Sequence, residues 1–230
     1  MPVGKRIYLK RDSTDKKIME EFAKLPASNV ADCMERSCAM NPRIKLISQP
    51  KGAVCGPAFT VKCRAGDNLA LHAALTYCHE GDVLVVSNEE DTTRALTGEV
   101  MMSYLFYTKK AAAIVIDGPI RDLESLSKWQ YPIYCTGSTP GGPYKEGPGE
   151  VNVPISCGGI NVNPGDLILM DRDGVIAIPT RDAEAVLEKA KKFHEIDEFK
   201  SQEAKAGRAN RDWVVKTLEA KGFEIIDEKY

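Results

Sequence analysis

In the first half of the chain, short apolar segments alternate with amphipathic stretches. The short apolar runs at 83–86 and 112–116 follow turn residues and predict buried strands, and β-favouring residues predict further strand over 52–63. Residues 69–77 and 98–110 have the length and pattern of helices. The order strand, helix, strand is typical of a βαβ unit, so part of the sheet is predicted to be parallel.

The second half of the chain carries shorter apolar runs with Gly and Asp between them. They predict strands at 131–135, 151–155, 158–162, 167–170 and 175–178. Strands of this length and spacing favour a small barrel-like or swivelling β layer. Residues 137–149 hold five Gly and three Pro, which predicts a long irregular loop, and loops of that length are more often functional than idle.

Helical patterns mark both ends of the chain. Residues 16–25 and 26–32 predict two helices, the second with Ser28 or Asn29 as its N-cap. Residues 181–202 and 212–218 predict the last two. No clean linker interrupts these elements. The prediction is therefore one α/β domain over residues 1–230, with a central mixed β layer flanked by helices.

Composition narrows the class of protein. The chain has 31 Lys and Arg, 33 Asp and Glu and no block of basic residues, so no nucleic-acid partner is expected. It has no apolar run of the roughly 18 residues that a membrane span needs, and the polar first 17 residues argue against a secretory signal. Seven Cys without a CxxC pair predict reduced, buried thiols, and three His without ligand spacing make zinc unexpected. We expect a cytoplasmic protein.

The most informative stretch follows the run at 112–116. Asp117-Gly-Pro predicts a tight turn, and Arg121 and Asp122 then open a predicted helix over 123–128. In open α/β folds, ligands bind at the carboxyl ends of such strands. Arg can grip a carboxylate through two hydrogen bonds, and Asp offers oxygens to a cation such as Mg²⁺. Two interpretations stay open here: a metal-assisted site for a small anion, or a surface ion pair beside a turn.

A second candidate lies at the start of the predicted helix 98–110. Gly98, Glu99, Val100 and Met101 form its first turn, where free backbone N–H groups can bind an anion. The alternative is a plain glycine N-cap. Helix amides, an Arg and a metal together would suit a 2-oxo acid such as pyruvate. The acidic run 89–91 is interpreted as a solvated surface, with metal binding as the weaker alternative.

Several short motifs share an order along the chain. They are Ser28-Asn-Val-Ala-Asp32, Gly66-Asp-Asn68, Gly81-Asp-Val-Leu-Val-Val86, Gly98-Glu99, Asp117-Gly-Pro-Ile-Arg-Asp122, Lys145-Glu-Gly-Pro-Gly-Glu-Val-Asn-Val-Pro154, Gly158-Gly159, Pro164-Gly-Asp166 and Asp173-Gly174. In this ordered set the chain resembles the family of 4-hydroxy-4-methyl-2-oxoglutarate aldolases and the related regulator of ribonuclease activity A. The resemblance covers about residues 27–207.

The resemblance implies roles for individual residues. Arg121 would bind substrate, and Asp122 would be the direct protein ligand of a divalent metal, Mg²⁺ or Mn²⁺. The backbone amides of Gly98, Glu99, Val100 and Met101 would bind the substrate carboxylate, and Glu99 would hold metal-bound water. An acidic residue from the C-terminal helix of a neighbouring subunit maps best onto Glu198, with Glu195 and Glu203 close by.

Two departures from the family pattern affect these roles. The stretch from Gly98 to Arg121 is one residue longer than usual, which could shift the register of the helix. Glu99 stands where some members carry Asp, which lengthens the reach of the carboxylate. In the ribonuclease-regulator branch the metal-binding Asp tends to be replaced, so the presence of Asp122 favours an enzyme.

The function implied by the resemblance is that of a class II, metal-dependent pyruvate aldolase, a carbon–carbon lyase. It would cleave a 4-hydroxy-2-oxo diacid and release pyruvate, with oxaloacetate decarboxylation as a second activity. Homotrimers or homohexamers, with C-terminal helices that reach a neighbouring subunit, would be the assembly. The alternative function is a non-catalytic regulator that binds a ribonuclease or another protein.

Overall fold

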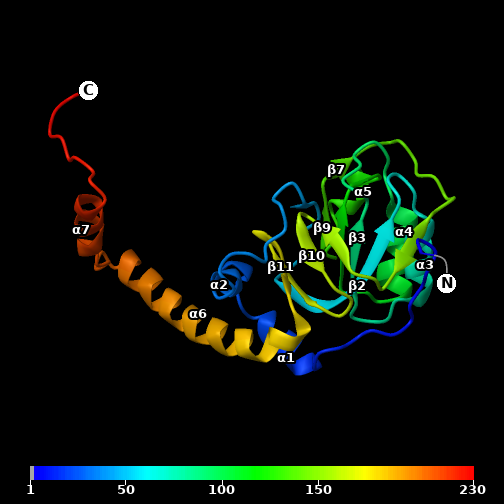
Figure 1. Cartoon of the computed structure of the whole chain (residues 1–230), viewed down its shortest axis with the longest axis horizontal. Coiled ribbons are helices and arrows are strands. Elements are labelled where there is room, and N and C mark those ends of the chain that lie inside the picture. The colour runs from blue at the N-terminus through cyan, green and yellow to red at the C-terminus, as the bar shows by residue number, and fades with distance from the viewer. Residues whose placement is uncertain (1–2) are drawn as a thin grey trace. The chain divides into compact units, whose positions relative to one another are not determined.

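A mixed eight-stranded sheet forms the centre of the protein in the computed structural model, which describes residues 3–230 (Figure 1). The strand order is β1-β6-β4-β3-β2-β11-β12, and β8 pairs with β2 off this path. The parallel strands are β2 (Val54–Cys63), β3 (Val83–Ser87), β4 (Ala113–Asp117) and β6 (Ile133–Cys135). The antiparallel strands are β1 (Lys45–Leu46), β8 (Gly149–Val151), β11 (Leu167–Asp171) and β12 (Gly174–Ile178). The predicted α/β class, with a partly parallel sheet, is confirmed.

Two short ladders lie outside this sheet. β5 (Pro119–Ile120) pairs with β7 (Gly137–Ser138), and β9 (Ile155–Cys157) pairs with β10 (Ile160–Val162). The predicted strand over 151–155 is wrong in its middle, where the chain bends between β8 and β9. Asn152 has a positive φ of 53°, and Pro154 has no N–H to donate to a ladder, so extended pairing stops there.

Helices cover one face of the parallel strands. They are α3 (Leu69–Tyr77), α4 (Glu99–Ser103), the π-helix η1 (Tyr104–Thr108) and α5 (Leu123–Leu126). Alternate strand residues, among them Phe59, Leu84 and Ile114, are buried against these helices. The opposite face, which includes Val83 and Val85, packs against the β9–β10 ladder. Because successive side chains of a strand point to opposite faces of the sheet, the same strands contribute to two separate apolar layers.

A third apolar cluster joins three further helices to β11 and β12. Its helices are α1 (Lys16–Phe22), α2 (Ala27–Asp32) and the start of α6 (Ala183–Lys205), which follows the 3₁₀ turn η2 (Thr180–Asp182). The predicted N-cap of α2, Ser28 or Asn29, is wrong, because Pro26 occupies that position. The Asp171 carboxylate on β11 accepts the N–H of Ala27 at 2.8 Å, so the cap comes from another element.

The predicted helix over 98–110 is continuous but not uniformly wound. After one α-helical segment, the N–H of Lys109 donates to the carbonyl of Tyr104, a π-type bond to the fifth preceding residue. A π turn holds more residues than an α turn. The segment before it, α4, keeps its α-helical form, and the extra residue expected between Gly98 and Arg121 stays a prediction.

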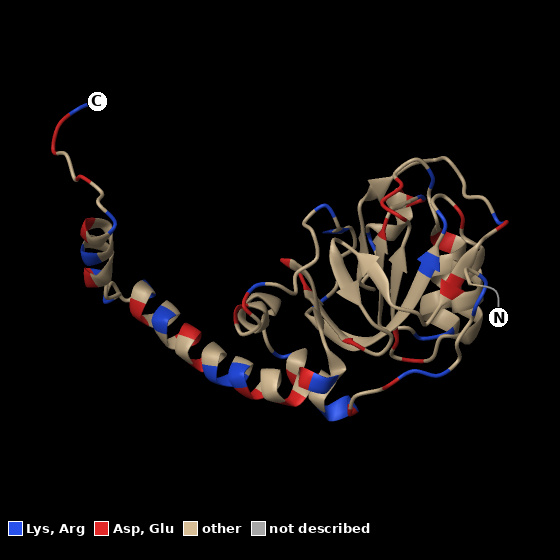
Figure 2. Ribbon diagram, viewed as in Figure 1, with Lys and Arg blue, Asp and Glu red and all other residues tan. Residues whose placement is uncertain are grey.

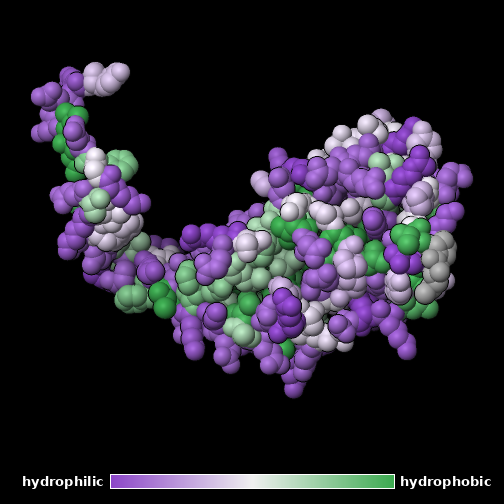
Figure 3. All heavy atoms as spheres, viewed as in Figure 1, coloured by the Kyte–Doolittle hydropathy of each residue, from purple (hydrophilic) through white to green (hydrophobic). Residues whose placement is uncertain are grey.

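Residues Lys192–Tyr230 form a second compact unit. It contains the rest of α6 and also α7 (Asp212–Ala220), which has no buried residue. Residues of both charge signs alternate along α6 (Figure 2), and apolar side chains such as Ile196, Phe199 and Trp213 are exposed in this unit, where Figure 3 shows green patches among purple. The predicted single-domain extent of 1–230 stays a prediction.

The prediction that the cysteines are buried holds for five of the seven. All seven are free; Cys38, Cys63, Cys78, Cys135 and Cys157 are buried, while Cys33 and Cys55 are partly exposed. Burial raises the pKa of the Cys63 thiol to about 12, which keeps it protonated and unreactive at neutral pH. Among the described residues, no helix combines the length and apolar character that crossing a membrane requires.

An ion pair between α1 and α6 gives a pH-dependent prediction. Hydrogen bonds from Lys191, at 2.5 Å, and from Lys24 lower the pKa of Glu21 to about 2. Because the folded pKa lies below the unfolded value, these contacts stabilise the fold at neutral pH and are lost as pH falls from about 4.5 toward 2. We expect Glu21→Gln to lower the urea midpoint of unfolding at pH 7. The difference between the midpoints of the variant and the wild type should become smaller toward pH 2.5. A difference that stays constant over this range would contradict the assignment, and Glu20→Gln, on the same helix, is the control.

Candidate active site

Backbone hydrogen bonds place the first turn of α4 beside the residues that follow β5. The N–H of Leu96 donates to the carbonyl of Pro119 at 3.1 Å, and the N–H of Arg121 donates to the carbonyl of Thr97 at 3.0 Å. On its other side, β5 pairs with β7. The two motifs that the sequence predicted separately, 98–101 and 121–122, are therefore adjacent in the fold.

Gly98 is the point of closest approach between these two segments. Its backbone is extended, with φ −156° and ψ −168°, a conformation open to any residue. A Cβ atom at this position, however, would lie 2.3 Å from Asp122 Oδ2 and 2.9 Å from Arg121 Cγ. The space around its Cα, and not its backbone angles, therefore favours glycine here.

Asp122 is held in an unusual backbone conformation. It has φ 62° and ψ 34°, in the left-handed region that Asp adopts more readily than most residues, and it is the N-cap residue of α5. Its Oδ2 accepts the backbone N–H of Glu99 at 2.9 Å and lies 3.8 Å from Arg121 Nε. The side chains of Arg121 and Asp122 are 50% and 42% exposed. The Asp122 carboxylate is thus held in position, and both side chains are open to a ligand.

The side chain of Glu99 is held by a residue that sequence reasoning missed. Ser125 Oγ, on α5, donates a hydrogen bond to Glu99 Oε1 at 2.6 Å. Both residues are half-buried. Ser125 also donates its backbone N–H to the carbonyl of Asp122 at 3.2 Å. One residue of α5 therefore contacts both predicted acidic site residues.

Two hollows open beside these residues and share Asp122 in their walls. A cavity of about 410 Å³ is lined by Arg121, Asp122, Leu123, Ser138, Thr139 and Pro140. A second, of about 450 Å³, is lined by Asp122, Glu124, Ser125, Lys128 and Trp129. Each volume is in the range of small-molecule sites. A small acid bound at Asp122 would have room on either side.

The loop over 137–149, predicted to be functional, is fastened next to Arg121. The Arg94 guanidinium donates to the carbonyl of Gly142 and to Tyr144 Oη, each at 2.8 Å, and stacks 4.0 Å from the centre of the Tyr144 ring. Arg121 Nη1 would lie 3.6 Å from a Cβ at Gly142. Part of this loop is therefore a fixed wall of the site.

Asp67, which the sequence analysis gave only as part of the Gly66-Asp-Asn68 motif, fastens the other end of this loop. Its buried carboxylate accepts the backbone N–H groups of Leu69, Glu146 and Gly147 at 2.7 to 2.9 Å. Burial raises the pKa of Asp67, but these three hydrogen bonds outweigh it, so the pKa lies below its usual value. Lys145, between these contacts, is exposed.

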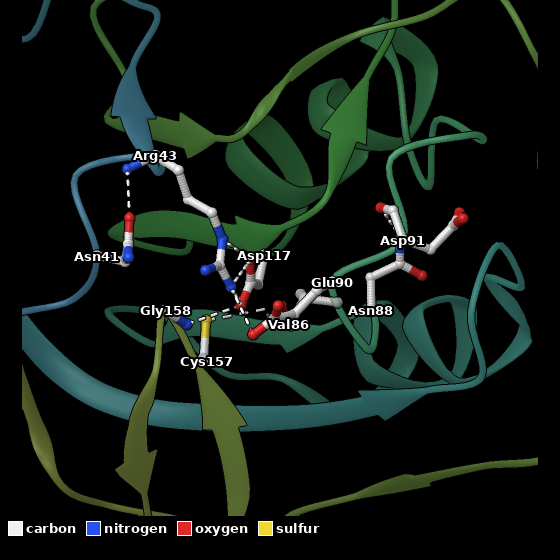
Figure 4. Close-up of polar contacts among 9 residues, drawn as sticks. All are labelled: Asn41, Arg43, Val86, Asn88, Glu90, Asp91, Asp117, Cys157 and Gly158. Carbon is white, nitrogen blue, oxygen red and sulfur yellow. Dashed lines mark hydrogen bonds and ion pairs between the residues drawn. The ribbon is translucent and has the colours of Figure 1, made fainter.

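An ion cluster lies at the end of β4 (Figure 4). The Arg43 guanidinium contacts both carboxylate oxygens of Asp117, at 3.0 Å and 2.8 Å, and also Glu90 at 2.9 Å. Asp117 Oδ2 accepts the backbone N–H of Gly158 at 2.8 Å as well. Glu90, in the acidic run, therefore has a cation partner, and the buried carboxylate of Asp117 is fully paired.

Asp122 suits a cation that is bound by few protein groups. Residues 3–230 contain no cluster of three or more His, Cys, Asp or Glu arranged for a metal ion. Mg²⁺ is commonly held by one or two carboxylates, with water and substrate as its other ligands. A single half-exposed carboxylate between two open cavities matches that chemistry, so the residues present fit Mg²⁺ or Mn²⁺ and not a tetrahedral zinc.

The structure brings together most of the predicted site. Gly98, Glu99, Arg121 and Asp122 are in contact, and the amides of Val100 and Met101 lie in the same helical turn. The Glu99 amide already has a partner, which leaves the two amides after it for a ligand. Glu198 lies in the second unit and pairs with His194 at 3.7 Å, and its role stays a prediction.

Comparison with known proteins places the chain in a family. A sequence model described as RraA-like, Aldolase/RraA, matches residues 27–177. A protein of Halalkalibacterium halodurans named "Putative 4-hydroxy-4-methyl-2-oxoglutarate aldolase" is 38% identical over 182 residues, which cover 79% of this chain and 86% of that protein.

Two solved structures share the fold. One is RraAS2 of Streptomyces coelicolor, described as an unusual member of the RNase ES inhibitor RraA protein family, with a TM-score of 0.74 and 26% identity over 83% of this chain and 98% of that one. The RNA-processing inhibitor RraA from Thermus thermophilis has a TM-score of 0.61 and 27% identity over 67% and 92%. The matched residues 27–177 contain Gly98, Arg121 and Asp122, and the protein belongs to the Aldolase/RraA family.

Proposed function

We propose that the protein is a divalent-metal-dependent aldolase that cleaves a 4-hydroxy-2-oxo diacid to pyruvate. The observation that carries this proposal is the contact between Asp122, Arg121 and the first turn of α4. An Arg suited to binding an acid, helix amides and a carboxylate suited to binding a metal lie within one small site. The name of the Halalkalibacterium halodurans relative supports the same substrate class.

Asp122 would hold the cation, Mg²⁺ or Mn²⁺. When bound there, the cation would act as a Lewis acid that stabilises negative charge on the 2-oxo group as the C3–C4 bond breaks. The same stabilisation would permit decarboxylation of oxaloacetate, in which CO₂ leaves from the corresponding position.

The chain's own residues supply binding and proton transfer. Arg121 would bind a substrate carboxylate or oxo oxygen, and the amides of Val100 and Met101 would donate to a second oxygen of the same acid. Glu99, through a water molecule, would remove the proton of the C4 hydroxyl, so that C4 becomes a carbonyl carbon. The electron pair of the C3–C4 bond then passes to the pyruvate enolate, which takes up a proton at C3.

The test is pyruvate release from 4-hydroxy-4-methyl-2-oxoglutarate and from oxaloacetate, with Mg²⁺ and then with EDTA. We expect turnover that EDTA abolishes and added Mg²⁺ restores. Turnover that is unchanged by EDTA would overturn the metal route. No turnover of either acid by the folded protein would overturn the aldolase proposal.

The second candidate function is that of a binding protein that inhibits a ribonuclease. Of the two structural relatives, one is described as a member of an RNase inhibitor family and the other as an RNA-processing inhibitor. The retained Asp122, beside Arg121 in an open site, favours the enzyme. Inhibition of a purified ribonuclease by wild type and by Asp122→Asn alike, without turnover of any 2-oxo acid, would favour the regulator.

A further inference from the structure

We infer that Ser125 is a positioning residue that holds the carboxylate of Glu99 in its working place. This inference rests on the proposed function, in which Glu99 directs proton removal. The contact is a 2.6 Å hydrogen bond from Ser125 Oγ to Glu99 Oε1. No sequence motif predicted it, because the two residues belong to different helices.

The length of the Glu99 side chain requires such a partner. Glu99 has one more methylene than an Asp at the same position, so its carboxylate reaches about 1.5 Å further and has one more rotatable bond. Without a fixed donor, this carboxylate would sample several rotamers. The Ser125 hydroxyl selects the one that points toward α5.

The position of Ser125 is itself fixed by the site. Its backbone N–H donates to the carbonyl of Asp122, which caps α5. Asp122 Oδ2 in turn accepts the backbone N–H of Glu99 at 2.9 Å. The three residues therefore form a closed ring of hydrogen bonds between α4 and α5. Within this ring the distance from the metal-binding carboxylate to the proton-removing carboxylate is set by short contacts.

The environment makes this hydrogen bond effective. Glu99 and Ser125 are both half-buried, so water competes less than it would at an open surface. A bond from a hydroxyl to a carboxylate is also stronger than one between neutral groups. Ser125 and Asp122, the two residues that contact Glu99, line the same cavity of about 450 Å³.

The experiment is a double-mutant cycle on the full chain with Mg²⁺ and 4-hydroxy-4-methyl-2-oxoglutarate. We expect Ser125→Ala to lower kcat about tenfold and to leave KM within about twofold, because Ser125 acts through Glu99. Ser125→Thr keeps the hydroxyl and should retain most of the activity. Ser127→Ala is the matched control, since Ser127 Oγ donates to the backbone carbonyl of Glu124, at 3.4 Å.

The second arm of the cycle uses Glu99→Asp. The shorter side chain of Asp no longer reaches Ser125 Oγ. We therefore expect Ser125→Ala to have little additional effect on kcat in the Glu99→Asp background. A crystal structure of metal-free Ser125→Ala should show the Glu99 carboxylate displaced and the bond from the Glu99 N–H to Asp122 kept.

The outcomes separate this inference from the proposed function. If the wild type is active and Ser125→Ala has the same kcat as Ser127→Ala, the inference is overturned and the proposed function is not. It would also be overturned if Ser125→Ala lowered kcat equally in the wild-type and Glu99→Asp backgrounds. A wild type that turns over neither 2-oxo acid would overturn the proposed function and, with it, the positioning role.

Discussion

Gly98→Ala is expected to lower pyruvate release by at least about a hundredfold while the protein stays folded, because misplacing catalytic groups by about 1 Å costs that much. The added Cβ would lie 2.3 Å from Asp122 Oδ2 and 2.9 Å from Arg121 Cγ, so both side chains must move. The backbone at Gly98 is extended and accepts alanine without strain. The damage should therefore fall on kcat/KM more than on stability.

The measurement compares pyruvate release with the urea midpoint for Gly98→Ala and for a matched glycine. A Cβ added at Gly52 would meet no atom within 4 Å, so Gly52→Ala should change neither quantity. If Gly98→Ala kept full activity, Asp122 and Arg121 could not be the groups on which turnover depends. Unfolding of Gly98→Ala would contradict the expectation that the damage falls on the site and not on stability.

Asp122→Asn is expected to lower metal-dependent turnover about a thousandfold. Asn has nearly the same size, tolerates the left-handed backbone at φ 62°, and can still accept the Glu99 N–H. What it loses is the negative charge that would bind the cation. The loss of activity should therefore accompany weaker binding of Mn²⁺, measured by electron paramagnetic resonance without substrate.

Glu124→Gln is the control for charge, because Glu124 lines the same cavity of about 450 Å³ as Asp122. It should bind Mn²⁺ about as well as wild type. Unchanged Mn²⁺ binding in Asp122→Asn would show that the cation is held elsewhere. Unchanged turnover in Asp122→Asn would contradict the proposed role of this carboxylate even if binding weakened.

The sequence predicted those parts of the site whose signals are local. The apolar runs identified β3 and β4, the turn after β4 identified Arg121 and Asp122, and the Gly before a helix identified Gly98. Each signal needs only a few neighbouring residues. The expectation that part of the sheet is parallel followed from their order along the chain.

The parts that could not be predicted depend on partners far apart in the sequence. Ser125 meets Glu99 across 26 positions, Arg94 meets Tyr144 across 50, and Arg43 meets Asp117 across 74. The predicted N-cap of α2 was wrong for the same reason, since the cap comes from Asp171, 144 positions from Ala27. A lone Ser or Arg has many possible partners, and only the folded chain selects one.

The π-helix η1 (Tyr104–Thr108) has a consequence for how chain length can vary in this family. Its wide turn lies between two anchored points, the Gly98 end of α4 and the start of β4, and it holds more residues than an α turn does. We expect an insertion or deletion inside this helix to change the count of residues from Gly98 to Arg121 while the contact between Gly98 and Arg121 is kept. Aligned sequences that differ in length here should therefore be matched from each anchor inward, with the gap assigned to the wide turn.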